Sequence, residues 1–169
     1  RTRLVLPPMA SGTGSEAGHV TDATIAHYQR IVGANHGLAF VEYTYVIDHG
    51  RSEPNQLGLT GDHHVAGLSR LAAAIRATGA LPGIQLTHAG AKTDAALAGR
   101  VPLGASALPV PAHGGDMPAP EPMTAAQAAE VAEAFVAAAV RAEAAGFGAI
   151  EIHAAHGYFF NQWLSPLTN

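Results

Sequence analysis

Apolar and polar residues follow one another along the chain in blocks that predict strands and helices in turn. Runs rich in β-branched and aromatic residues indicate strands, and apolar residues spaced three and four apart indicate amphipathic helices. Strands are predicted over residues 3–6, 37–46, 82–88 and 149–153. The helices predicted between them begin at Thr21 or Asp22, at Asp62 and at Thr124, and they end near Gly33, Gly79 and Gly146.

The third of these helices has the strongest local signals. Thr124 and Gln127 have the spacing of a capping box, in which the hydroxyl accepts an N–H bond and the amide reaches back to the cap. Gly146 suits the position that ends a helix with positive φ. Its apolar stripe is formed by Val131, Phe135, Ala138, Ala142 and Ala145. We interpret this alanine-rich helix as scaffold.

The order of elements predicts an α/β fold with a parallel sheet covered by helices. Two architectures fit, a doubly wound open sheet and a (β/α)8 barrel. The segment PPMASGTGSE after the first strand lacks the third glycine of the dinucleotide-binding spacing G-x-G-x-x-G, which favours the barrel. Residues 89–123 are predicted to form one long loop rich in Gly, Pro and Ala. Both architectures bind ligands at the C-terminal ends of their strands.

Polar residues gather at those strand ends, most clearly in the segment EIHAAHGY, residues 151–158. His153 shares a strand face with Glu151, and His156 lies in the following turn. Two imidazole N–H groups that converge there can hold and polarise a carbonyl or nitro oxygen, and Tyr158 can supply a proton. The alternatives are a buried structural His153 with a packing Tyr158, or a weak H-x-x-H metal site completed by His88 or Glu42.

Other candidates are individually ambiguous. Gln85, on an otherwise apolar strand face, can bond the imide edge of a heterocycle or simply a neighbouring strand. His88 is more compatible with a structural bond to a loop carbonyl. His63 and His64 are expected on the solvated face of a helix's first turn, and RSEPNQ, residues 51–56, as an exposed loop. The Pro7-Pro8 pair ends the first strand.

Composition narrows the class of protein. The chain has 169 residues, a net charge of −4 and no run of Lys or Arg, which argues against nucleic acid and anionic membranes as partners. It has no cysteine, so disulfides and thiolate chemistry are excluded, which fits a cytoplasmic protein. No apolar stretch approaches the ~18 residues of a membrane span.

Several segments, in this order, resemble the old yellow enzyme family of FMN-dependent ene-reductases. They are RLVLPPM, GLAFVEYTYV, IQLTHAG, VPLGASALPVP with EPMT, and the most specific, AAGFGAIEIHAAHGYFFNQWLSPLTN. The resemblance covers essentially the whole chain. It is strongest to the branch with two histidines at the substrate anchor, where other members carry His and Asn.

The resemblance implies a (β/α)8 barrel that binds FMN at its mouth and uses NADPH or NADH as reductant. Hydride from flavin N5 and a proton from Tyr158 would reduce activated C=C bonds in small α,β-unsaturated substrates, such as enones and nitroalkenes. His153 and His156 would anchor the substrate oxygen. The implied cofactor-binding residues are Pro7, Pro8, Met9, Ala10, Tyr43 and Gln85, and no metal ligand is assigned.

Two departures from the family pattern bear on the site. Ala10 stands where many members have Cys or Thr, so it cannot make the hydrogen bond that tunes the flavin. Tyr43 stands where a small residue usually faces the flavin, which predicts a narrower pocket.

The length predicts only about four βα units, the first half of a barrel that typically has ~250 residues. Residues 1–169 are therefore expected to be the N-terminal half of an FMN-binding barrel domain, truncated at both ends, that alone binds FMN weakly or not at all. A homo-oligomer is expected for the full-length protein. The competing hypotheses are a metal-dependent barrel hydrolase using His88, His153 and His156, and a non-catalytic half barrel.

Overall fold

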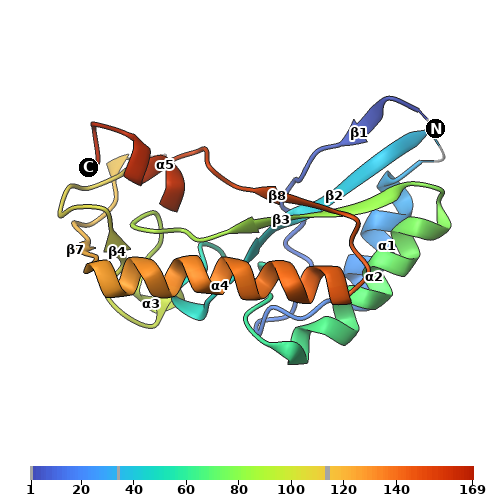
Figure 1. Ribbon diagram of the computed structural model, residues 1–169, viewed down its shortest axis with the longest axis horizontal. Helices are drawn as coiled ribbons and strands as arrows, with labels where there is room; N and C mark the ends of the chain where they lie inside the picture. Colours follow the sequence, from blue (N-terminus) through green and yellow to red (C-terminus); the bar gives the residue numbers. More distant parts are fainter. Residues whose placement is uncertain (1, 34, 113–114) are drawn as a thin grey trace.

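The computed structural model describes residues 2–33, 35–112 and 115–169, and its central feature is a four-stranded parallel sheet (Figure 1). The strand order is β1-β2-β3-β8, with each strand parallel to its neighbour. The bounds are Leu4–Leu6 for β1, His36–Tyr45 for β2, Leu81–Thr87 for β3 and Ala149–Ile152 for β8. All four differ from the predicted strands by no more than about a residue at each end, and the predicted parallel α/β architecture is confirmed.

Three long helices cover one face of this sheet, as Figure 1 shows. They are α1 (Asp22–Ile31), α2 (Val65–Ala77) and α4 (Ala125–Ala144). Two 3₁₀ turns, η1 (Asp48–Gly50) and η2 (Asp62–His64), lie between β2 and α2, and the short helix α5 (Phe159–Leu164) follows β8. Within the described ranges, no helix combines the length and the apolar character needed to cross a bilayer.

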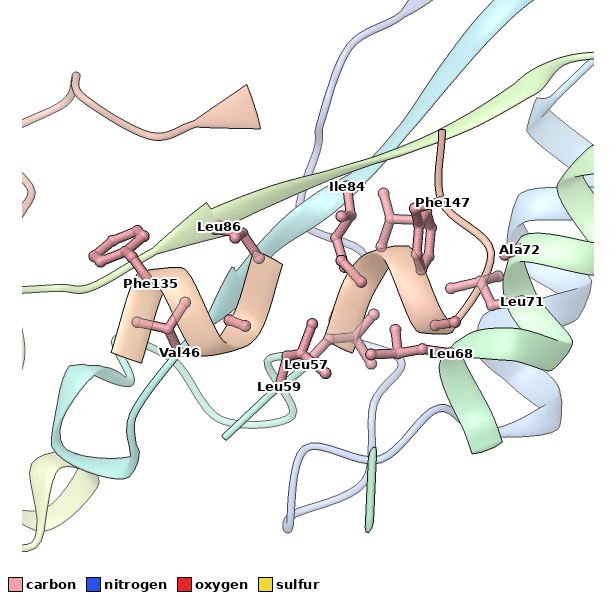
Figure 2. Close-up of a cluster of buried hydrophobic side chains, with 14 of the residues drawn as sticks. Val46, Leu57, Leu59, Leu68, Leu71, Ala72, Ile84, Leu86, Phe135 and Phe147 are labelled. Atoms are coloured by element: carbon pink, nitrogen blue, oxygen red, sulfur yellow. The ribbon is translucent and has the colours of Figure 1, made fainter. Parts of the chain in front are cut away.

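The main core lies between the sheet and these helices (Figure 2). Ile84 and Leu86 of β3 point toward α4 and meet residues of α2 and of the β2–α2 loop. The predicted stripe of α4 is buried, with Val131, Ala138 and Ala142 fully inaccessible. Burial of apolar surface contributes about 25 cal/mol of stability per Å². The packing of the helices therefore stabilises the position of the sheet.

The outer strands carry exposed apolar side chains. On β1, Leu4 is 57% and Val5 is 50% exposed, and on β8, Ile150 is 40% and Ile152 is 45% exposed. Exposed apolar edge strands are prone to pair or pack further. This agrees with a parallel sheet that forms half of a barrel.

The helix N-caps predicted at Thr21 and Thr124 are both confirmed. The side chain of Thr21 accepts from Thr24 N at the start of α1, and that of Thr124 accepts from Gln127 N at the start of α4. The Gln127 side chain accepts from Thr124 N at 2.9 Å, which completes the capping box.

Three expectations are wrong. Asp62 does not cap a helix, because it opens η2 and its carboxylate instead accepts from Arg141 Nε at 2.8 Å. His64 is not solvated, since it is only 3% exposed. The segment 89–123 is not structureless, and its short elements are α3 (Ala95–Ala98), β4 (Leu103–Gly104), β5 (Pro111–Ala112), β6 (Gly115–Asp116) and β7 (Glu121–Pro122).

Removing the α4 cap tests how much this helix depends on it. We expect Thr124→Ala to lower the free energy of unfolding by about 1 kcal/mol, because the Gln127 N–H loses its side-chain acceptor and the Gln127 amide loses the hydroxyl that helps to orient it. Chemical denaturation of the intact protein measures the loss, with Thr124→Ser as the control that keeps the hydroxyl. Equal losses in the two variants would contradict the capping role.

Candidate active site

A cavity of about 520 Å³ opens at the C-terminal ends of β1, β2, β3 and β8. The structure brings most of the predicted site residues to its wall. Those lining it are Pro7, Pro8, Ala10, Tyr43, Gln85, His153, His156 and Tyr158. Met9 is the exception, since it does not line the cavity and its side chain is 53% exposed.

His153 is held at the end of β8 as a neutral, buried hydrogen-bond donor. Burial lowers the pKa of His153 to about 4, and the neighbouring His156 and Lys92 act in the same direction. Its Nδ1 accepts from Ala155 N at 3.3 Å, so in the neutral ring the proton lies on Nε2. The donor nitrogen of this neutral imidazole therefore lies near the cavity at physiological pH, with His156 Nδ1 3.4 Å away as its partner in the absence of a ligand.

His156 lies next to this donor in a tight turn. Its Nδ1 is 3.4 Å from His153 Nε2, and its backbone is left-handed with φ of +58°. A left-handed non-glycine residue costs about 1–3 kcal/mol. The turn is stabilised by Lys92, whose Nζ donates to the His156 carbonyl at 2.6 Å, and by Asn161, whose Oδ1 accepts from Gly157 N at 2.8 Å. The strained turn therefore brings two imidazoles to one cavity wall.

Tyr158 is packed between aromatic rings on the same wall. Its ring stacks on Tyr43 with centroids 5.8 Å apart and meets His153 edge to face at 4.8 Å. Lys92 Nζ lies 5.3 Å from the Tyr158 ring centroid. Burial raises the pKa of Tyr43 well above its usual range, and Tyr158 and Glu53 add to this. Tyr43 is thus a neutral neighbour that limits the width of the cavity beside Tyr158.

Gln85 of β3 lies opposite Glu151 of β8 in the parallel register. Its Nε2 donates to Glu151 Oε1 at 2.6 Å, which orients the carboxamide. Gln85 lines the cavity and is only 7% exposed. The bond to Glu151 occupies one amide hydrogen, so Oε1 is available as an acceptor on the cavity wall.

Two carboxylates of the cavity were not among the predicted site residues. Glu151 follows from the register of β3 and β8, which the sequence does not reveal. Glu53 belongs to the segment 51–56 that was expected to be exposed. That segment is tied down by Gln56, which is 4% exposed, accepts from Ser52 N at 2.8 Å and donates to the Tyr43 carbonyl at 3.2 Å.

His88 does not join His153 and His156 at the cavity. It is 1% exposed, and its Nδ1 accepts from Gly90 N at 2.8 Å while its Nε2 lies 3.1 Å from His49 Nδ1. A neutral ring that accepts at Nδ1 donates from Nε2, so both nitrogens of His88 are occupied. The role of His88 is structural, as expected, but its partners are the Gly90 N–H and His49 rather than a loop carbonyl. A metal site formed by His88, His153 and His156 therefore has no geometric support among the described residues.

The buried His88 predicts a loss of stability in acid. Burial lowers the pKa of His88 to about 3, and His49 adds to this, whereas an unfolded histidine titrates near 6.5. Between these values the unfolded chain binds the extra proton, so stability falls as the pH falls, by about 1.4 kcal/mol per pH unit. Urea denaturation of the intact protein between about pH 6 and pH 5 measures this slope, and His88→Gln should reduce it. An unchanged slope in that variant would contradict the assignment.

Comparison with protein families matches residues 1–169 to the NADH:flavin oxidoreductase / NADH oxidase family. An NADPH dehydrogenase of Halalkalibacterium halodurans is 41% identical over 170 residues, which is 100% of this chain and 48% of that protein. An NADPH dehydrogenase of Clostridium acetobutylicum is 38% identical, with the same shares covered. The chain thus spans about half the length of the curated relatives it matches.

Solved structures give the same result for the fold. An old yellow enzyme homologue from Zymomonas mobilis superposes with a TM-score of 0.88 and 25% identity, over 99% of this chain and 48% of that chain. Old yellow enzyme from Pichia sp. superposes with a TM-score of 0.87 and 26% identity, over 99% of this chain and 46% of that one. The half-barrel fold predicted from the sequence is confirmed. Because the family match extends over every residue that builds the cavity, the chain belongs to the NADH:flavin oxidoreductase / NADH oxidase family.

Proposed function

We propose that residues 1–169 form the N-terminal half of an FMN-binding barrel domain in an NAD(P)H-dependent oxidoreductase that reduces activated C=C bonds. The supporting observation is that the residues of both proposed roles line one cavity. Those proposed to bind the cofactor are Pro7, Pro8, Ala10 and Gln85, and those proposed to bind the substrate are His153, His156 and Tyr158. The substrates are small α,β-unsaturated compounds such as enones and nitroalkenes.

The residues present fit the flavin of this proposal. Pro7, Pro8 and Ala10 give a stiff, small-residue wall at the end of β1, which suits a flat ring system. The buried Gln85 amide, oriented by Glu151, offers an acceptor and a donor to a pyrimidine edge. When bound, FMN supplies the hydride for the reduction.

His153 and His156 are proposed to hold the oxygen of the substrate's activating group. His153 Nε2 carries its proton while the ring stays neutral, so it donates without placing a buried charge in the cavity. The two ring nitrogens lie 3.4 Å apart, close enough to approach a single oxygen. Donors directed at an oxygen that gains negative charge stabilise the transition state more than the ground state.

Tyr158 is proposed to give its phenolic proton to the carbon α to the activating group. The phenol lines the cavity beside His153, and its ring position is fixed by Tyr43 on one side. A proton donor in a positioned ring loses little rotational freedom before reaction, which is how proximity accelerates transfer.

The test is a pair of anaerobic half-reactions on the intact protein with bound flavin. We expect NADPH or NADH to bleach the flavin absorbance, and 2-cyclohexenone then to restore it with formation of cyclohexanone. Separate mixing of each reductant identifies the preferred nicotinamide cofactor. A protein that binds no flavin, or a reduced flavin that reacts with oxygen but not with any enone or nitroalkene, would contradict the proposed function.

A further inference from the structure

A second group of chemically capable side chains lies outside the cavity. His19 comes from the loop before α1, and His63 and His64 come from η2. Ring centroids are 4.1 Å apart for His63 and His64, 4.7 Å for His19 and His64, and 5.6 Å for His19 and His63. One ring nitrogen from each residue lies within 4.8 Å of the other two. The three rings line a separate hollow that Asp48 and Glu16 also line.

The protonation pattern of His64 is the observation that points to a ligand. His64 is 3% exposed, and its Nε2 lies 3.3 Å from the Ala17 carbonyl oxygen. A carbonyl only accepts, so the proton of the neutral ring lies on Nε2 and Nδ1 keeps its lone pair. That Nδ1 is buried and has no hydrogen-bond partner among the described residues. Histidines that bind metals characteristically donate one N–H to a backbone carbonyl and coordinate through the other nitrogen.

Both loops that carry the cluster are held in place. The turn that presents His19 is closed by two bonds to Ser15, one from Ser15 N to His19 O at 2.9 Å and one from His19 N to Ser15 Oγ at 3.0 Å. Gly18 in that turn has φ of +78°, and a Cβ there would clash with the Tyr45 hydroxyl. The position therefore requires glycine.

On the other side, η2 is fixed by its own backbone and by a long-range ion pair. His64 N donates to Gly61 O at 3.1 Å, and Asp62 accepts from Arg141 Nε at 2.8 Å. The cluster is thus built from two positioned loops, with two exposed rings, His19 and His63, that are able to rotate.

We propose that His19, His63 and His64 bind one divalent transition-metal ion of the zinc class through their imidazole nitrogens. Three nitrogen donors suit Zn²⁺, Cu²⁺ or Ni²⁺ rather than Mg²⁺ or Ca²⁺, which prefer oxygen. Tetrahedral zinc with Zn–N distances of about 2.0–2.1 Å needs nitrogens about 3.4 Å apart. Rotation of the two exposed rings closes the remaining gap, and a water takes the fourth position. The ion would join the β1–α1 loop to the start of α2.

Calorimetric titration of Zn²⁺ into the intact, untagged and chelator-treated protein tests the proposal. We expect one Zn²⁺ per chain and a rise in the melting temperature at saturation. His19→Gln and His63→Gln should each weaken binding by about tenfold or more, and the double variant should lose the thermal shift. Both residues are exposed, so the fold does not depend on them, whereas the buried His64 is left intact. His27→Gln, on α1 outside the cluster, is the matched control and should bind as the unsubstituted protein does.

Three results would overturn the proposal. The first is the lack of saturable Zn²⁺ binding, as expected if a water satisfies His64 Nδ1. The second is full affinity in the His19→Gln/His63→Gln variant. The third is Zn²⁺ binding that persists in this double variant but is lost in His156→Asn, which would place the ion in the cavity instead. None of these outcomes depends on flavin binding or turnover, so they are independent of the proposed oxidoreductase function.

Discussion

Replacing Tyr158 with phenylalanine is expected to slow enone reduction by about 10²–10⁴-fold, the usual contribution of a positioned general acid. Phenylalanine keeps the ring that stacks on Tyr43 and meets His153, so the shape of the cavity wall is preserved. Only the donated proton is lost. Reduction of the flavin by NADPH needs no proton from this phenol and should proceed unchanged. Stopped-flow absorbance of the two half-reactions on the intact protein separates these effects.

Tyr43→Phe is the matched control, because Tyr43 lines the same cavity and stacks on Tyr158. Its phenol has a pKa raised by burial, by Tyr158 and by Glu53, which makes it a poorer acid. We expect this variant to retain most of the enone-reduction rate. If Tyr43→Phe instead gave the large loss and Tyr158→Phe did not, the proton donor would be Tyr43 and the proposed role of Tyr158 would be wrong.

The parts of the fold that the sequence predicts well are those specified by short-range signals. The capping box of Thr124 and Gln127, the buried stripe of α4 and the positive φ of Gly146 all depend on residues close in sequence. Asp62 shows where this fails. Its position before an apolar stripe is typical of a cap, but its carboxylate accepts a hydrogen bond from Arg141, which is 79 residues away in the sequence. A local pattern cannot include a competitor that only tertiary packing supplies.

The residues of the candidate site also divide into those that the sequence predicts and those that only the tertiary structure reveals. Gln85, His153 and Tyr158 are predicted to lie together because parallel strands bring their C-terminal ends to one edge. For Glu151 the sequence predicts only that it shares a strand face with His153, since its contact with Gln85 depends on strand register. The resemblance groups Met9 with its neighbours in the β1 corner, yet adjacent residues at a strand end point in different directions and Met9 is exposed.

The sequence does not indicate the His19–His63–His64 cluster, for a related reason. His63 and His64 read as the solvated first turn of a helix, and nothing near them in sequence indicates that His19 packs against both rings. The burial of His64 follows from the 3₁₀ turn that precedes α2. That turn changes the direction of the side chains from the one a helix beginning at Asp62 would give them.

The proposed oxygen anchor of His153 and His156 can be tested without turnover. Phenolates resemble the enolate formed by hydride addition, and the two imidazoles are expected to bind their oxygen in the oxidised holoprotein. A hydrogen bond to a charged group contributes about 1.5–3 kcal/mol, so His156→Ala should weaken phenolate binding by about 10–100-fold. A variant with both His153 and His156 replaced should lose more than either single change. Perturbation of the flavin absorbance on titration with 4-nitrophenol measures the affinity.

His156→Asn distinguishes donation from structural support of the turn. Asparagine tolerates the left-handed backbone that His156 adopts, with φ of +58°, and its amide restores an N–H donor. Phenolate affinity should therefore recover in His156→Asn relative to His156→Ala. His156→Gly is the complementary control, because it accepts the same backbone without a donor and should remain weak. If glycine restored affinity as well as asparagine, relief of backbone strain would account for the alanine defect and His156 would not be part of the anchor.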